Sequence, residues 1–347
     1  MVKKGLQLDL RGDGKTPVIQ IEAKNLAEAT HKTIIACHDY GFRKETPKQR
    51  YGMTLGYDAD ITVRVSNPDS EPKVYFPGMY DDGRGVVQYN LELTHGIHNH
   101  WKKSPENPEF WGYTYNGRFI DQLPFVFARI KKDWEDKKGE WGNGKGRISG
   151  RDYQFGIWKP SDDIILEQQD PACWQRGQIS FNLNEKGEIV MNYQTDWRSR
   201  DLLKAWNMNN IAQIELMKLM AAKVSDMLGV PIKLGAYIDR ASSLHEYGLY
   251  VDRDGLEKQI SRMKKDGWKK KSMGLDDYFA VSGRDKTGLK RVISAQMIAE
   301  QMGHGLNQPI SKLEELGFNL DKCTYPAEWD TWAKSWDRKP NPKLLKG

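Results

Sequence analysis

Apolar and polar residues follow two different periods along the first 250 residues of the chain. A helical period predicts helices over residues 25–40, 86–95 and 121–134. Asn25 is a good N-cap for the first helix, and Gly96 is a stop signal for the second. Residues 210–228 are apolar on nearly all sides, which is typical of a helix buried on every face.

A period of two predicts strands elsewhere. Isolated strands are expected over 61–65, 153–158 and 233–238. A hairpin of 178–183 with 189–194 is expected around the turn Glu185-Lys186-Gly187. Residues 43–58 are polar, and we expect this stretch to end in a turn at Gly56.

The composition changes after residue 252, where the sequence becomes basic. Residues 257–272 carry a run of lysines and arginines, and a shorter helix is expected at about 292–302. We therefore predict a catalytic domain over 1–256 and a basic accessory region over 257–347 without a large core of its own.

Bulk composition narrows the class of protein. The chain has 347 residues and 38% hydrophobic residues, enough for one large domain or two smaller ones. No apolar run approaches the roughly 18 residues of a membrane span, and the N-terminus lacks a signal-peptide core. A cytoplasmic location is expected. A net charge of +6 favours an anionic partner: nucleic acid, or a phosphorylated or polyglutamated small molecule.

Cys173 is the cysteine whose position and neighbouring residues suit a catalytic thiol. Three scattered cysteines cannot form a disulfide framework. Cys173 follows a proline-containing turn and precedes a strand, which suits a partly exposed thiol, and only the thiolate of such a group attacks. Residues that could lower the pKa of this thiol are Arg176, Arg198 and Arg200.

Other polar groups cluster after Cys173. Arg198-Ser199 offers a forked guanidinium and a hydroxyl, a donor set for a phosphate, although a surface salt bridge is the ordinary fate of an arginine. Three asparagines (Asn207, Asn209 and Asn210) lie where the buried helix is expected to begin. One can simply cap that helix, and a carboxamide there can also read the edge of a base. His95, His98 and His100 are interpreted as surface histidines, so no metal is expected.

Taken together, these residues resemble the thymidylate synthase superfamily, which includes the pyrimidine nucleotide hydroxymethylases. The motifs that carry the resemblance are, in order, Asp121-Gln122-Leu123, Cys173 with Gln178, Arg198-Ser199-Arg200-Asp201, Asn209 or Asn210 before the buried helix, and His245 with Tyr247. The match covers roughly 110–250, with Arg50 upstream similar to the family's phosphate arginine.

The resemblance implies an α+β fold with a large mixed sheet, helices on one face, and two subunits packed sheet to sheet. It implies one-carbon transfer from 5,10-methylenetetrahydrofolate to C5 of a pyrimidine deoxynucleoside monophosphate, with Cys173 adding to C6. The implied substrate contacts are Gln178 and Asn209 or Asn210 on the ring, His245 and Tyr247 on the sugar, and Arg50, Arg198, Ser199 and the partner subunit's Arg151 on the phosphate. Asp201 and Trp111 are assigned to the folate.

The sequence departs from the family pattern at three places. Trp174 stands where the family has a histidine after the nucleophile. Counting back from Gly96, the catalytic glutamate position holds Gln88 or Tyr89, and Glu92 comes one turn later. The chain also ends in a basic extension rather than a short apolar tail, and such a tail shields a hydride step from water.

These departures favour a hydroxymethylase, in which water rather than hydride completes the reaction, and asparagine at the base position favours dUMP over dCMP. Thymidylate synthase and dCMP hydroxymethylase stay open as alternatives. A hypothesis of another class is a nucleic-acid-binding protein that uses the basic run 257–272. A catalytically dead homologue with a structural role is a further alternative, because the glutamate is missing.

Overall fold

The computed structural model describes most of the first 278 residues. The described residues are 6–9, 15–48, 52–79, 83–96, 99, 112–136, 148, 150–166, 170–252, 255–275 and 277–278. The fold is α+β with a large mixed sheet, as predicted. The chain forms two compact units, unit 1 (Met1–Tyr80, Gln194–Asn210 and Ala236–Gly274) and unit 2 (Asp81–Tyr193, Ile211–Gly235 and Leu275–Gly347).

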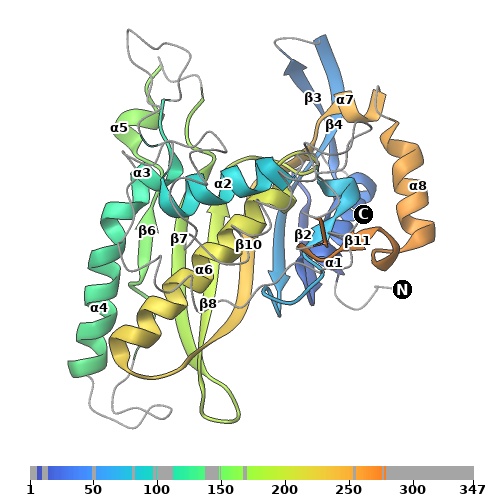
Figure 1. Cartoon of the computed structure of the whole chain (residues 1–347). Helices are drawn as coiled ribbons and strands as arrows, with labels where there is room; N and C mark the ends of the chain where they lie inside the picture. Colours follow the sequence, from blue (N-terminus) through green and yellow to red (C-terminus); the bar gives the residue numbers. More distant parts are fainter. Residues whose placement is uncertain are drawn as a thin grey trace, which may run out of the picture. The chain divides into compact units, whose positions relative to one another are not determined.

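Unit 1 combines a mixed sheet with helices α1, α7 and α8 (Figure 1). Its elements are β1 (Leu6–Asp9), β2 (Val18–Ala23), α1 (Leu26–Tyr40), β3 (Phe42–Lys48), β4 (Gly52–Val65), β5 (Val74–Tyr75), η1 (Phe76–Gly78), β9 (Arg200–Asp201), α7 (Gly248–Asp252), α8 (Leu256–Asp266), η3 (Lys269–Lys271) and β11 (Ser272–Met273). It also holds most of β10 (Ile232–Glu246), and the strand order is β1-β2-β4-β10. β2 runs parallel to β4, whereas β4 and β10 are antiparallel.

Helix α1 confirms the prediction for residues 25–40. The side chain of Asn25 accepts a hydrogen bond from the backbone N–H of Glu28 at 2.9 Å, which satisfies one of the free amides at the helix start. The apolar face of α1 packs against β2 and β4. On β2 and over residues 59–65 of β4 every second residue is buried, including Ile19, Ile21 and Ile61.

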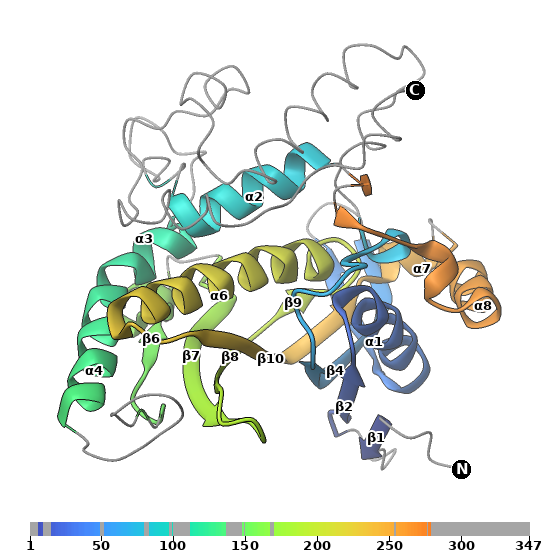
Figure 2. The ribbon, with the colours of Figure 1, turned by 60° about the horizontal axis from the view of Figure 1, so that its bottom comes forward.

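Unit 2 carries the remaining helices and strands. Its elements are α2 (Gly83–His95), α3 (Tyr115–Phe119), η2 (Ile120–Gln122), α4 (Leu123–Asp136), β6 (Gln154–Gly156), α5 (Pro160–Asp163), β7 (Trp174–Leu183), most of β8 (Ile189–Trp197) and most of α6 (Trp206–Leu228). Strands β6, β7 and β8 are neighbours in that order. α6 crosses one face of β7 and β8 (Figures 1 and 2).

The predicted hairpin and helices of unit 2 are confirmed, with one correction. Gly187 has φ 71° in the hairpin turn and Gly96 has φ 64° after α2, left-handed conformations that favour glycine. α6 is buried along Ile211–Met220, as its sequence predicts. However, α6 begins at Trp206 rather than Asn210, so the three asparagines lie inside the helix and none caps it.

The expected turn at Gly56 is wrong. Gly56 lies within β4, and a side chain there would meet the carbonyl oxygen of Glu246 at 2.3 Å. The glycine therefore permits close approach of β10 rather than a change of chain direction. The polar stretch before it forms β3 and the start of β4, which pair antiparallel.

Helix α8 explains the first part of the basic run. Leu256, Ile260 and Met263 are buried on its inner face, and α8 contacts α1. Lys264 pairs with Asp39 at 2.6 Å. Part of the positive charge of the basic run is therefore paired with an acidic residue of the same chain. This favours interpreting the run as a solvated helix face rather than as a nucleic-acid-binding surface. The expected helix at 292–302 lies outside the described residues, and the boundary at 256 stays a prediction.

No helix in the described part of the chain is both long and apolar enough to cross a membrane.

Candidate functional site

Cys173 lies directly before β7 in unit 2, at the strand entrance where the sequence predicted it. The thiol is half-buried and forms no disulfide. Trp174, the next residue, is fully buried and makes edge contacts with Tyr115 and Phe119. The first residue of β7 therefore anchors the strand in the core, while Cys173 stays accessible.

A buried carboxylate holds the segment before Cys173. Asp163 Oδ1 accepts from the backbone N–H of Ala172 at 3.0 Å, and Asp163 Oδ2 accepts from the N–H of Lys159 at 2.8 Å. Arg118 forms a buried ion pair with the same carboxylate. Burial acts to raise the pKa of Asp163, but these hydrogen bonds outweigh it and the net pKa is lowered. We call this arrangement the Asp163 clamp.

Two tyrosines from the aromatic segment adjoin Cys173. The backbone of Cys173 hydrogen-bonds to the side chain of Tyr113, which also hydrogen-bonds to Tyr115. Burial, followed by the nearby Cys173, raises the pKa of Tyr113. Burial likewise raises the pKa of Tyr115 well above its ordinary value. Both phenols therefore keep their protons and can donate or accept hydrogen bonds next to the thiol.

The other predicted residues of unit 2 occupy three different elements. Gln178 is half-buried on β7, Glu92 is half-buried on α2, and Arg151 is exposed at the bend before β6. Because residues three apart share a helix face, Glu92 lies on the same side of α2 as Tyr89. Arg50 and Trp111 lie outside the described residues.

In unit 1 a buried polar network surrounds Arg200. Asp239 Oδ1 accepts from Arg200 at 2.6 Å, and Asp239 Oδ2 accepts from Trp206 Nε1 at 2.7 Å. Arg200 also donates to Asn210 Oδ1 at 2.9 Å and to Asn209 Oδ1 at 3.3 Å. The sequence suggested Arg200 as a group that activates the thiol. That suggestion is corrected here, because its charge is matched by Asp239 within unit 1.

The rings of His245 and Tyr247 lie close together, with centroids 4.6 Å apart. His245 Nδ1 is 3.2 Å from the carbonyl oxygen of Ser243, which only accepts, so Nδ1 carries the proton. Nε2 then presents a lone pair. It is buried, and no described residue hydrogen-bonds to it. A ligand hydroxyl is the kind of group that this nitrogen can accept from.

The Arg-Ser-x-Asp motif lies between β8 and α6, and its last two residues form β9. Arg198 and Ser199 are half-buried. Asp201 Oδ1 accepts from the backbone N–H groups of Leu203 and Lys204 at 3.0 and 2.9 Å, and Asp201 Oδ2 accepts from Tyr250 at 2.9 Å. Asp201 thus shapes its own turn, and its assignment to the folate stays a prediction.

Glu246, between the two predicted sugar contacts, is fully buried. Neither of its carboxyl oxygens has a hydrogen-bond partner among the described residues. Burial, with a smaller effect from Asp39, Asp201 and Glu257, raises the pKa of Glu246 well above its ordinary value. The carboxyl is therefore neutral in the folded protein near pH 5, where the unfolded chain already ionises it.

Replacing Glu246 by methionine is expected to stabilise the protein by about 2 kcal/mol, because an unpaired polar group leaves the core. The folded pKa is raised, so wild-type stability falls as pH rises above 4.5 toward the folded pKa. The gain of Glu246→Met should therefore be larger at pH 8 than at pH 5. Calorimetric unfolding at both pH values measures this. Glu246→Gln is the control, since it should remove the pH dependence while keeping a buried polar group. An equal effect of methionine at the two pH values would contradict the assignment.

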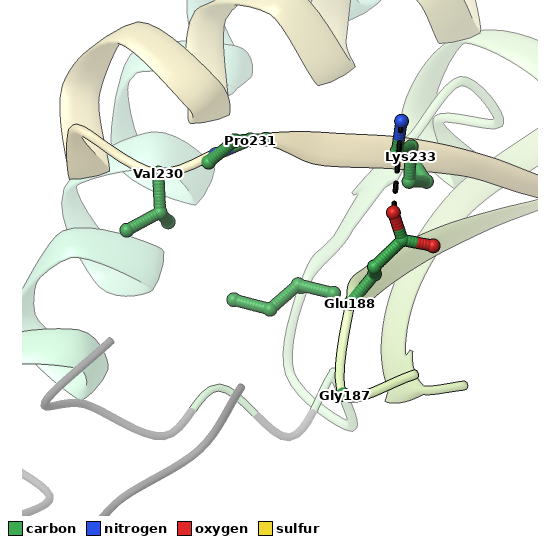
Figure 3. Close-up of a pocket in the computed structure, with 6 residues that line it drawn as sticks. Gly187, Glu188, Val230, Pro231 and Lys233 are labelled. Atoms are coloured by element: carbon green, nitrogen blue, oxygen red, sulfur yellow. Dashed lines mark ion pairs between the residues drawn. The ribbon is translucent and has the colours of Figure 1, made fainter. Parts of the chain in front are cut away.

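A small hollow in unit 2 is unrelated to these residues. It measures about 130 Å³ and lies beside the hairpin turn (Figure 3). Its lining consists of Gly187, Glu188, Ile189, Val230, Pro231 and Lys233. Lys233 Nζ lies 3.7 Å from Glu188 Oε1 at one edge. None of the predicted site residues lines it.

Among solved structures, the chain is similar to the thermostable thymidylate synthase A from Bacillus subtilis. The TM-score is 0.47 at 14% sequence identity, over 68% of this chain and 84% of that one. No family model and no curated protein matches the sequence.

The sequence analysis missed the buried charged residues that orient the predicted site residues. Asp163, Arg118 and Asp239 were not singled out. A signal existed for Asp239, because the alternation of β10 places it in phase with the buried Tyr237 and Ala241. A charged residue at an inward position predicts a buried partner.

Proposed function

We propose that the chain transfers a one-carbon unit to C5 of dUMP and releases 5-hydroxymethyl-dUMP. The observation that carries the proposal is a pair of buried polar atoms in unit 1, Asn210 Nδ2 and His245 Nε2, with no partner among the described residues. Buried polar groups are almost always hydrogen-bonded, so two buried atoms without a partner at motif positions support a ligand contact there. Their chemistry, one donor and one acceptor, suits a 4-oxo pyrimidine and a sugar hydroxyl.

Cys173 supplies the nucleophile in this proposal. Its thiolate adds to C6 of the pyrimidine, and the electron pair of the 5,6 double bond moves toward the 4-oxo group, which makes C5 nucleophilic. Asn210 donates a hydrogen bond to the 4-oxo group and thereby stabilises the developing negative charge. Gln178 supports the ring. Tyr113 and Tyr115, whose hydroxyls keep their protons, can donate hydrogen bonds beside the thiol.

The folate 5,10-methylenetetrahydrofolate supplies a carbon at the oxidation level of formaldehyde. Transfer of that carbon to C5, release of tetrahydrofolate, loss of the C5 proton to water, addition of water to the new carbon and elimination of the Cys173 thiolate from C6 would give the hydroxymethyl product without any external reductant. Asp201 is the residue we assign to the folate, and Glu92 is the residue we assign to the water. Both residues are half-buried.

We further propose that the enzyme is a homodimer and that the 5′-phosphate is bound by Arg50, Arg198, Ser199 and the partner subunit's Arg151. The support is the exposure of Arg151 at its bend, which leaves the guanidinium accessible to a second subunit. A forked guanidinium binds phosphate oxygens in pairs.

Incubating the full chain with methylenetetrahydrofolate and either dUMP or dCMP tests the proposal. We expect the mass of dUMP to rise by one hydroxymethyl substituent. A methyl gain with loss of the folate's hydride would instead assign thymidylate synthase, and a product from dCMP alone would assign the cytosine enzyme. No product from either nucleotide, together with salt-dependent DNA binding, would favour the nucleic-acid alternative.

A further inference from the structure

Arg200 holds the carboxamide of Asn210 in one orientation. The guanidinium is 2% exposed and lies 3.8 Å from the centre of the Trp197 ring. Its Nη1 donates to Asp239 and its Nη2 donates to Asn210 Oδ1 at 2.9 Å. The ion pair, the ring and the hydrogen bond together leave this side chain little freedom.

A guanidinium donates hydrogen bonds and cannot accept them, so the oxygen of Asn210 must face Arg200. The hydroxyl of Tyr237 lies 2.9 Å from the same oxygen and 3.1 Å from Asp239 Oδ1, and its single proton can be donated to either. Arg200 is thus the donor that fixes the orientation of the Asn210 carboxamide. Its Nδ2 points away from the network, is buried, and has no partner among the described residues.

We propose that Arg200 is a positioning residue that turns Asn210 into a one-way hydrogen-bond donor. An asparagine free to flip offers either a donor or an acceptor and so accommodates a 4-oxo or a 4-amino pyrimidine. Here a flip would set the amide NH₂ against the guanidinium and leave the buried Nη2 donor of Arg200 unpaired. The site therefore selects an acceptor, the 4-oxo group, over an amino donor. This inference rests on the proposed function and names Arg200 and Tyr237 as the residues that set base specificity.

Arg200→Lys is the variant that tests it. Lysine keeps the charge opposite Asp239 but lacks the fork that also reaches Asn210. The measurement is the ratio of the Kd values for dCMP and dUMP, from calorimetric titration of the full chain without folate. We expect wild type to prefer dUMP by about 100-fold and Arg200→Lys to lower the ratio about tenfold, with dCMP binding unchanged or tighter. Equal weakening of both nucleotides would mean a purely structural role and overturn the inference.

Two further variants keep the test decisive. Tyr237→Phe removes the second donor but keeps the ring, so it should lower the ratio by a smaller factor even if Arg200→Lys unfolds. Arg240→Met is the matched control, because Arg240 lies on β10 with Tyr237 and pairs with Asp60 at the surface. The ratio of the two Kd values should not change in this variant. If wild type binds neither nucleotide, the proposed function fails together with this inference. If wild type binds dUMP and the ratio is unchanged in both network variants, only this inference fails.

Discussion

Replacing Cys173 by alanine is expected to abolish one-carbon transfer, lowering turnover on the order of 10⁴-fold or more, since the nucleophile of a covalent mechanism has no substitute. The variant should also lose the covalent adduct that wild type forms with 5-fluoro-dUMP and methylenetetrahydrofolate. Its stability should change little, because Cys173 is half-buried and lies before β7 rather than in the core. Initial rates and the mass of the denatured protein measure the two effects.

Cys37 provides the matched control. Its thiol is fully buried on α1, and Sγ is 3.4 Å from the carbonyl oxygen of Leu244. Burial raises the pKa of Cys37 well above its ordinary value, so it stays a thiol and does not attack. Cys37→Ala should keep both the activity and the adduct. A Cys173→Ala protein that turns over at the wild-type rate would remove the basis of the proposed mechanism.

Cys173→Ala also serves to test the proposed homodimer. Arg151→Ala alone should be nearly inactive if the partner subunit's Arg151 binds the phosphate. Mixing it with Cys173→Ala should restore part of the activity, because a mixed dimer holds one site with both residues intact. A mixture as inactive as its components would argue against sharing of the arginine.

Local signals predicted the elements well. The Asn25 cap, the glycine after His95 and the turn at Gly187 each act within a few residues, and the structure contains all three. The apolar surface of residues 211–220 predicted a buried helix for the same reason. The start of that helix was missed because the polar residues Asn207, Asn209 and Asn210 are buried by partners that the sequence does not reveal.

Long-range pairs account for the failures. The sequence suggests Arg200 as one of three groups that could lower the pKa of the thiol, yet its partner Asp239 lies 39 residues further along the chain. Gly56 resembled a turn, but the reason for a glycine there is the backbone of Glu246 on another strand. The polar residues can be identified from the sequence, but only the fold shows which of them face one another. The motifs that resemble a known family could be recognised because the order of their residue types along the chain is specific.

Asp163→Ala is expected to destabilise the protein by about 3–5 kcal/mol, because it leaves Arg118 buried without its counter-charge. It also removes the acceptor of the Ala172 amide, so the segment that carries Cys173 loses its anchor. Turnover by the fraction that remains folded should fall as well. Denaturant unfolding and initial rates at a temperature well below the midpoint separate the two effects.

The pH dependence distinguishes the clamp from a generic packing loss. The folded pKa of Asp163 is lowered, so its stabilisation is fully present above the unfolded pKa of about 3.8 and is lost as pH falls through the folded value. The difference between wild type and Asp163→Ala should therefore stay constant from pH 7 to pH 5 and shrink below about pH 4. Asp162→Ala is the control: its carboxylate is 3.9 Å from Arg118 and 49% exposed, so it should cost less than about 1 kcal/mol. A large loss in Asp162→Ala, or a loss in Asp163→Ala that is the same at pH 3 and pH 7, would show that the clamp does not hold the nucleophile segment through its charge.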